Sequence, residues 1–240
     1  MAEGRTQAAP GVLKRLKKTA KALERGWVDR FDPLESARRA HREAYHARKR
    51  KFLRRYVPEG GVGAEVGVFW AHFSEVLAGH FKPAKLYLVD PWDRLHGETF
   101  SWSTPYTLDG TLKTRDAMAR AEALARRYPG VVEVRKQYST EFFAEIPDGT
   151  LDFVYLDAAH KYEDVLADLT CIWPKLKPTG VLIGDDYFED PGAKHAGTKR
   201  AVDHFAKRHD IALIKEDHYQ YILPRADAPL PDEENGTHAT

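Results

Sequence analysis

The chain of 240 residues has a single cysteine, Cys171, so it cannot form an intramolecular disulfide. A lone thiol is typical of a protein from a reducing compartment. The sequence also lacks any apolar run near the roughly 18–20 residues that a helix needs to span a bilayer. Its first residues, MAEGRTQAAPGVLKRLKK, lack the apolar centre of a secretory signal. These absences predict a cytoplasmic protein without a membrane span.

The chain as a whole has no large excess of positive or negative charge. Lys and Arg number 37 and Asp and Glu 36, for a net charge of +1, so the whole chain is neither a basic nucleic-acid binder nor an acidic solvating domain. The average hides a basic segment, Lys14–Arg55, whose sparse apolar residues predict two amphipathic helices. Two interpretations of this segment stay open: a solvated lid or dimer arm, and a surface for RNA, an anionic substrate or a membrane.

After the turn signal PEGGVG at residues 58–63, strand-like and helix-like stretches alternate. The strand-like runs are AEVGVF, KLYLVD, VVEVRK, LDFVYLD and GVLIGDD, and two further runs, IALIKED and YQYILP, form a predicted hairpin. The alternation predicts a Rossmann-like α/β fold with a mainly parallel seven-stranded sheet and an antiparallel edge strand. We divide the chain into a basic helical N-terminal extension (1–57), a Rossmann-like domain (58–224) and a disordered tail (225–240).

Ligands of such sheets bind beyond the carboxyl ends of the strands. The first loop lacks G-x-x-x-x-G-K-[ST], and Val66 replaces the third glycine of a dinucleotide fingerprint, so a phosphate-binding loop is not expected. Glu65 suits a cationic ligand, and Asp90, at the end of the second strand, can accept hydrogen bonds from ribose hydroxyls. A cationic nucleoside without phosphate fits both residues, and S-adenosylmethionine is such a molecule.

Three aspartates close the fourth and fifth predicted strands. Asp157, Asp185 and Asp186 offer only oxygen ligands, which suit Mg²⁺, Mn²⁺ or Ca²⁺. A divalent ion there would lower the pKa of a bound hydroxyl, and His160 could take the proton. The alternative is that Asp157 caps the following helix and that His160 lies on the surface.

The blocks VYLDAAHKYEDVLADLTCIWPKLKPTGVLIGDDY and GTKRAVDHF resemble class I S-adenosylmethionine-dependent methyltransferases, in particular the macrocin O-methyltransferase-like branch. The likeness covers roughly residues 61–221, and GVLIGDDY is its most specific part. It implies that the cofactor binds at Glu65, Gly67, Asp90 and Ser139. It further implies that Asp157, Asp185 and Asp186 hold a metal, with Mg²⁺ expected, that positions an acceptor hydroxyl.

The sequence departs from related catechol-type enzymes at the general base. Those enzymes have a lysine three residues after the first metal aspartate, where this chain has His160, followed by Lys161. The base is therefore left open among His160, Lys161 and Asp157. The usual acidic residue after the third strand is also replaced, by the sequence QYS.

The resemblance implies methyl transfer to a hydroxyl of a small molecule or sugar, assisted by a divalent cation. One alternative is an RNA methyltransferase that uses the basic segment, although the fourth strand ends in LDAAH rather than in an N/D-P-P-Y motif. Another is a binding module with the same fold and no turnover. Assembly as a homo-oligomer stays open.

Overall fold

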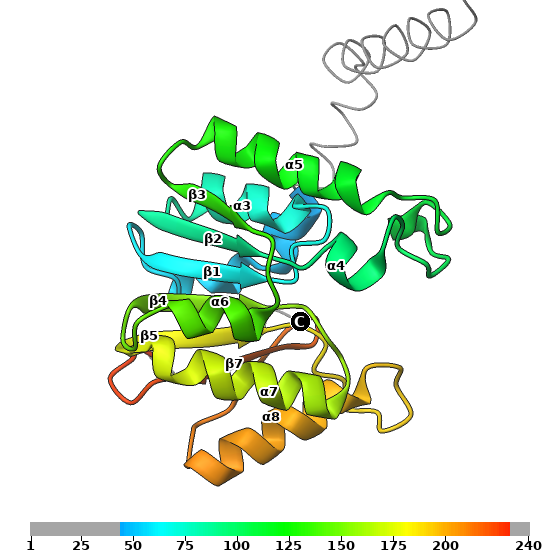
Figure 1. Ribbon diagram of the computed structural model, residues 1–240. Coiled ribbons are helices and arrows are strands. Elements are labelled where there is room, and N and C mark those ends of the chain that lie inside the picture. Colours follow the sequence, from blue (N-terminus) through cyan, green and yellow to red (C-terminus); the bar gives the residue numbers. More distant parts are fainter. Residues whose placement is uncertain (1–43, 231–240) are drawn as a thin grey trace, which may run out of the picture. The chain divides into compact units, whose positions relative to one another are not determined.

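The computed structural model describes residues 44–230, and Figure 1 shows their arrangement. The first predicted helix of the basic segment and the start of the second lie outside the described residues, as do residues 231–240 of the predicted tail. Among the described residues, no helix is long and apolar enough to cross a membrane.

Seven strands form one sheet in the order β3-β2-β1-β4-β5-β7-β6. The first five pair in parallel, and β7 pairs antiparallel with both β5 and β6. This confirms the predicted Rossmann-like fold, with the hairpin at one side of the sheet. The strands are β1 (Val62–Val66), β2 (Lys85–Val89), β3 (Val132–Arg135), β4 (Leu151–Leu156), β5 (Leu176–Gly184), β6 (Ile214–Glu216) and β7 (Gln220–Pro224).

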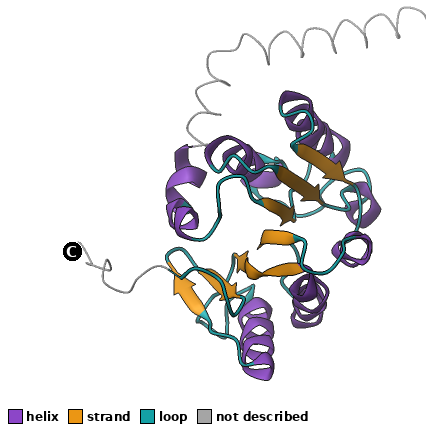
Figure 2. Ribbon diagram, turned by 90° about the vertical axis from the view of Figure 1, so that its left-hand side faces the viewer, coloured by secondary structure: helices purple, strands orange, loops and turns teal. Residues whose placement is uncertain are grey.

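Helices cover both faces of the sheet (Figure 2). They are α3 (His72–His80), α4 (Asp93–His96), α5 (Thr114–Arg127), α6 (Ser139–Glu145), α7 (Tyr162–Ile172) and α8 (Ala196–His209), with 3-10 helices η1 (Lys51–Arg55), η2 (Pro105–Thr107) and η3 (Trp173–Lys175). Because neighbouring strand residues point to opposite faces, β4 supplies Phe153 and Tyr155 to one core and Val154 and Leu156 to the other. The first core includes residues of α3 and α5, and the second includes residues of α6, α7 and α8.

The end of the basic segment packs into the first core. Residues 44–49 are helical and lead into η1, from which Leu53 is fully buried. Tyr56 and Val57, which follow η1, belong to the same core cluster. The last residues of the segment are therefore held against the sheet by apolar burial, and its charges are brought close to the strand ends.

The strand order reverses at β1, since β2 lies on one side of it and β4 on the other. Such a reversal opens a crevice beyond the carboxyl ends of the central strands. Gly67, directly after β1, has φ +87, and a Cβ there would collide with the main-chain oxygen of Asp157. Glycine therefore lets the ends of β1 and β4 approach closely, and any side chain at this position is both strained and blocked.

Candidate functional site

Glu65 lies in β1 and is 2% exposed. The hydroxyl of Ser74 on α3 donates to its carboxylate. Burial raises the pKa of Glu65 to about 8, although this hydrogen bond and the charge of Arg50 oppose the rise. The nearby charges of Asp157 and Asp90 add to it. A buried acid held among other acids is poised to accept a cation.

Asp90 follows β2 and ties two loops together. Its Oδ2 accepts a hydrogen bond from the Phe69 N–H at 2.9 Å, and its Oδ1 accepts one from the Trp92 N–H at 2.7 Å. Burial raises the pKa of Asp90, and these backbone hydrogen bonds counter part of the rise. Each carboxylate oxygen can accept a second bond, so the structure leaves Asp90 able to bind the ribose hydroxyls predicted for it.

The two loops that Asp90 holds contain backbone conformations that non-glycine residues rarely adopt. Phe69 has φ +50, Ala71 has φ +54 and Trp92 has φ +41. Such residues each cost on the order of 1–3 kcal/mol and are concentrated at ligand sites and active sites. Their position beyond β1 and β2 marks this end of the sheet as a binding region.

Ser139 is the first residue of α6, and its hydroxyl donates to Asp168 on α7. Asp168 is 6% exposed, and burial raises its pKa to about 6, with the Ser139 hydrogen bond opposing the rise. The pair joins two helices of the second core. The Ser139 hydroxyl thus takes part in a contact between helices, and its predicted role in cofactor binding stays a prediction.

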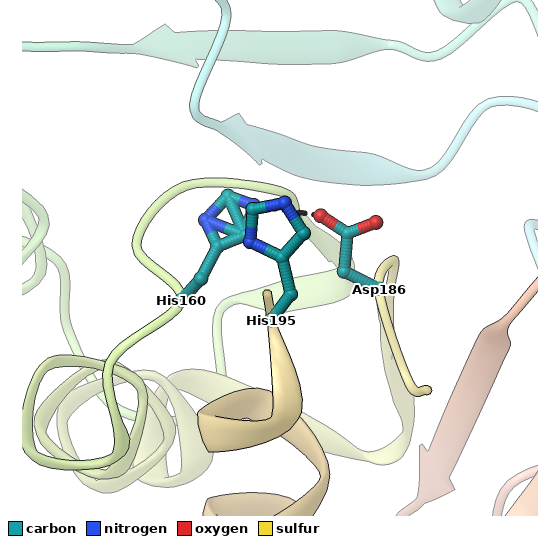
Figure 3. Close-up of side chains that lie close together, drawn as sticks. All are labelled: His160, Asp186 and His195. Carbon is teal, nitrogen blue, oxygen red and sulfur yellow. Dashed lines mark hydrogen bonds and ion pairs between the residues drawn. The ribbon is translucent and has the colours of Figure 1, made fainter. Parts of the chain in front are cut away.

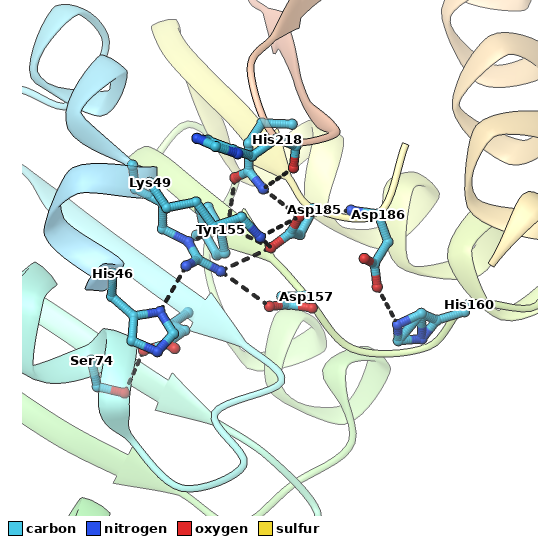
Figure 4. Close-up of polar contacts among 12 residues, drawn as sticks. His46, Lys49, Ser74, Tyr155, Asp157, His160, Asp185, Asp186 and His218 are labelled. Atoms are coloured by element: carbon cyan, nitrogen blue, oxygen red, sulfur yellow. Dashed lines mark hydrogen bonds and ion pairs between the residues drawn. The ribbon is translucent and has the colours of Figure 1, made fainter. Parts of the chain in front are cut away.

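Arg50 is the centre of a buried polar network that the sequence did not reveal. Its partners Tyr155, Asp157 and Asp185 are labelled in Figure 4. Its side chain is 4% exposed, and its Nη2 lies 2.8 Å from Asp185 Oδ2 and 3.5 Å from Asp157 Oδ2. Its Nε donates to the hydroxyl of Tyr155 at 2.6 Å. Lys49 adds a second cation, with its Nζ 2.9 Å from Asp185 Oδ2.

The three predicted metal ligands line one small cavity, but among the described residues their carboxylate oxygens are not gathered as one set of ligand atoms. Asp157 and Asp185 face Arg50, whereas Asp186 is directed at His160, with Asp186 Oδ2 2.6 Å from His160 Nε2 (Figure 4). The guanidinium already supplies the positive charge that gathers two of the carboxylates. The aspartate trio as it stands therefore does not fit a shared divalent ion.

The described residues hold one group of three or more His, Cys, Asp and Glu side chains whose ligand atoms all lie within 4.8 Å of one another. It consists of His160, Asp186 and His195 (Figure 3). His195, just before α8, was not singled out from the sequence. It stands in the irregular stretch DPGAKHAG, where no periodicity or motif marks it.

The three candidate bases differ in their surroundings. The side chain of Asp157 is 35% exposed. Burial raises its pKa to about 7, and the charge of Asp185 adds to the rise while that of Arg50 opposes it. Burial and the neighbouring His195 lower the pKa of His160 to about 4. Lys161 is exposed at the N-cap of α7. Of the three, Asp157 combines access with a pKa near neutral pH.

A family model described as a methyltransferase domain matches residues 59–187, which is more than half of the chain. No curated protein matches. Among solved structures, the chain resembles a protein from Corynebacterium glutamicum, with 14% identity, a TM-score of 0.54 and coverage of 86% of this chain and 97% of that one.

Two further solved structures are similar. One is a proposed S-adenosyl-L-methionine-dependent methyltransferase from Methanococcus maripaludis, with 13% identity, a TM-score of 0.50 and coverage of 94% of this chain and 97% of that one. The other is a SAM-dependent methyltransferase from Aquifex aeolicus, with 18% identity, a TM-score of 0.48 and coverage of 73% and 87%. At 14% and 13% identity, the likeness to the Corynebacterium glutamicum and Methanococcus maripaludis structures shows a common fold.

Proposed function

We propose that this chain, which belongs to the methyltransferase domain family, transfers a methyl group from S-adenosylmethionine to a hydroxyl of a small molecule or sugar. The observation that carries the proposal is the pair of buried carboxylates, Glu65 and Asp90, at the ends of the neighbouring strands β1 and β2. They suit a cationic nucleoside, and the loop between them lacks a phosphate-binding motif. The family match confirms the predicted methyltransferase class, while the macrocin-like branch stays a prediction.

Methyl transfer from a sulfonium requires mainly that the acceptor oxygen be aligned with the methyl carbon. In the proposed site, Glu65 balances the positive charge of the cofactor and Asp90 accepts from the ribose hydroxyls. Asp157 takes the proton of the acceptor hydroxyl, since its carboxylate is accessible and its pKa is about 7. We assign no step to a magnesium ion on the aspartate trio, because Arg50 stands between Asp157 and Asp185.

Aromatic side chains beside the Asp90 loops support a small acceptor with a flat or apolar face. The ring of Phe69 lies 4.7 Å from that of Phe100, and the ring of Phe100 lies 5.3 Å from that of Trp102. Trp102 is 38% exposed, although Phe100 is buried. The segment between β2 and α5 thus presents an aromatic surface next to the cofactor side of the crevice, and we place the acceptor there.

Three cations in the described part of the basic segment are paired within the chain. Lys49 and Arg50 pair with Asp185, and Arg55 pairs with Glu216 at 2.6 Å. These cations neutralise carboxylates of the same chain, so they do not form a free basic surface for phosphate groups.

The first test is calorimetric titration of S-adenosylmethionine into the wild-type protein and into Asp90→Ala. We expect the dissociation constant to rise at least about tenfold in the variant, which corresponds to about 1.4 kcal/mol. The matched control is Asp152→Ala. Asp152 also accepts a backbone hydrogen bond, from Val62 N at 2.8 Å, but it lies at the start of β4, away from the carboxyl ends of the strands where the cofactor is proposed to bind. Absence of binding to the wild-type protein would overturn the proposed function. An equal loss in both variants would contradict the ribose assignment.

Because the pKa of Glu65 is raised, we expect cofactor binding to release a proton from this residue. A cation beside Glu65 favours its ionised form, so binding lowers a pKa that is about 8 in the free protein. Affinity should therefore rise with pH up to about 8 and level off above it. Titrations in two buffers of different ionisation enthalpy measure the protons released. In Glu65→Gln the released fraction of a proton should vanish, and an unchanged release would show that another group titrates.

A further inference from the structure

Next to the proposed crevice, side chains from three separate segments meet (Figure 3). His160 comes from the loop after β4, Asp186 directly follows Asp185 at the end of β5, and His195 is the N-cap of α8. His160 Nε2 lies 2.6 Å from Asp186 Oδ2, and the centroids of the two imidazole rings are 3.9 Å apart. Two imidazoles and one carboxylate thus offer three ligand atoms within 4.8 Å of one another.

Around this cluster, the backbone at the start of α8 lies very close to the backbone of the loop after β4. A Cβ on Gly197 would collide with the main-chain oxygen of His160, so glycine allows the start of α8 to lie against the β4–α7 loop. Asp186 has φ +62, a conformation that costs a non-glycine residue free energy. Its N–H donates to Asp185 Oδ1 at 2.9 Å, which helps to keep it in that conformation. The strained backbone directs the Asp186 side chain toward His160 and away from the other aspartates (Figure 4).

Polar atoms without partners gather at the same place. Within the part of the chain that the structure describes, His195 Nδ1, Thr198 Oγ1 and Tyr221 Oη are buried and lack a hydrogen-bond partner. Thr198 and Tyr221 line a cavity of about 10 Å³ together with His160, Asp157 and Asp186. This volume holds about one water molecule. A buried polar group without a partner destabilises the fold, so the site is suited to a ligand that brings water with it.

We propose that His160, Asp186 and His195 bind one divalent transition-metal ion, such as Zn²⁺ or Fe²⁺, with water at the remaining position. Imidazole nitrogens favour these ions, whereas Mg²⁺ prefers oxygen ligands. Ligand bonds of about 2.0–2.2 Å place the ligand atoms of a tetrahedral site about 3.3 Å apart, so the pair His160 and Asp186 opens slightly when the ion enters. An ion bound at this position leaves the ion pair between Arg50 and Asp185 intact.

The binding of this ion is independent of the proposed methyl transfer, and only its use in catalysis rests on that function. Because Asp157 lines the same cavity as His160 and Asp186, the ion stands beside the proposed base. Its charge and its bound water would favour the deprotonated form of an acceptor hydroxyl placed there.

The test uses the full-length protein without a polyhistidine tag, after removal of metals with a chelator. Co²⁺ serves as the probe, since its visible absorption reports the ligand geometry, and Mg²⁺ is titrated in parallel by calorimetry. We expect one Co²⁺ per chain, bound at least about tenfold more tightly than Mg²⁺, as the order of ligand preferences requires.

Two variants, His195→Ala and His160→Ala, should each weaken Co²⁺ binding at least about tenfold, as the loss of a ligand predicts. The control is His204→Ala on the same helix α8, where His204 contacts Tyr162 instead. Unchanged Co²⁺ binding in both ligand variants would overturn the proposal, as would Mg²⁺ binding as tight as that of Co²⁺. Cofactor titration of the same samples separates the two hypotheses: a protein that binds Co²⁺ but not S-adenosylmethionine keeps the metal site and loses the proposed function.

Discussion

Replacing Arg50 with alanine is expected to lower the free energy of unfolding by about 3 kcal/mol, because the change removes a cation from buried carboxylates. Arg50 pairs with Asp185 and Asp157, and its guanidinium also lies 4.3 Å from the centre of the Phe73 ring. Breaking a buried ion pair from one side costs about 3–5 kcal/mol. Lys49 still neutralises Asp185 in the variant, so the lower end of that range applies. Urea unfolding monitored by circular dichroism measures the loss.

Arg55→Ala is the matched control, since Arg55 ends the 3-10 helix η1 that directly follows Arg50, and its pair with Glu216 is an exposed one. Its side chain is 48% exposed, and exposed pairs contribute about 0–1 kcal/mol. A loss in Arg55→Ala as large as that in Arg50→Ala would show that charge in this segment, rather than burial of Arg50, stabilises the fold. A negligible loss in both variants would contradict the network as described.

The sheet could be predicted from sequence because its signals are local. Each strand is a short apolar run closed by polar residues, and each helix carries an apolar stripe, so the alternation itself defines the fold. Glu65, Asp90 and Asp157 were singled out as candidates for the same reason. A carboxylate at the end of a parallel strand faces the crevice whatever the rest of the chain does.

Arg50 and His195 could not be found in this way, since their positions depend on contacts over long sequence separations. Arg50 stands in a run of Lys and Arg residues, and nothing local distinguishes it from its neighbours. Its partner Asp185 is 135 residues away. The prediction of a metal at the aspartate trio assumed that the acids lack a counter-charge. The structure supplies that charge from the basic segment, which the sequence had suggested only as a lid, an arm or a binding surface.

Replacing Asp157 with asparagine is expected to lower kcat by about 10²–10⁴, the usual contribution of a general base. The amide keeps the size of the side chain. Glu65 and Asp90, the residues proposed to bind the cofactor, are unchanged. The dissociation constant of S-adenosylmethionine should therefore stay within about threefold, which is less than about 0.7 kcal/mol. Steady-state kinetics with an acceptor and calorimetry with the cofactor measure the two quantities separately. A parallel loss of cofactor affinity would make Asp157 a binding residue.

The pH profile identifies the base independently of the size of the effect. A base must be deprotonated to act, so with Asp157 in this role kcat should rise with pH through about 7 and stay constant above it. His160, with a pKa of about 4, would already be neutral over that whole range and would produce no such rise. The rise should disappear in Asp157→Asn and persist in Lys161→Ala, because Lys161 is exposed at the start of α7. A rise that survives in Asp157→Asn would assign the proton transfer to another group. The contact of Asp157 with Arg50 would then have a structural role only.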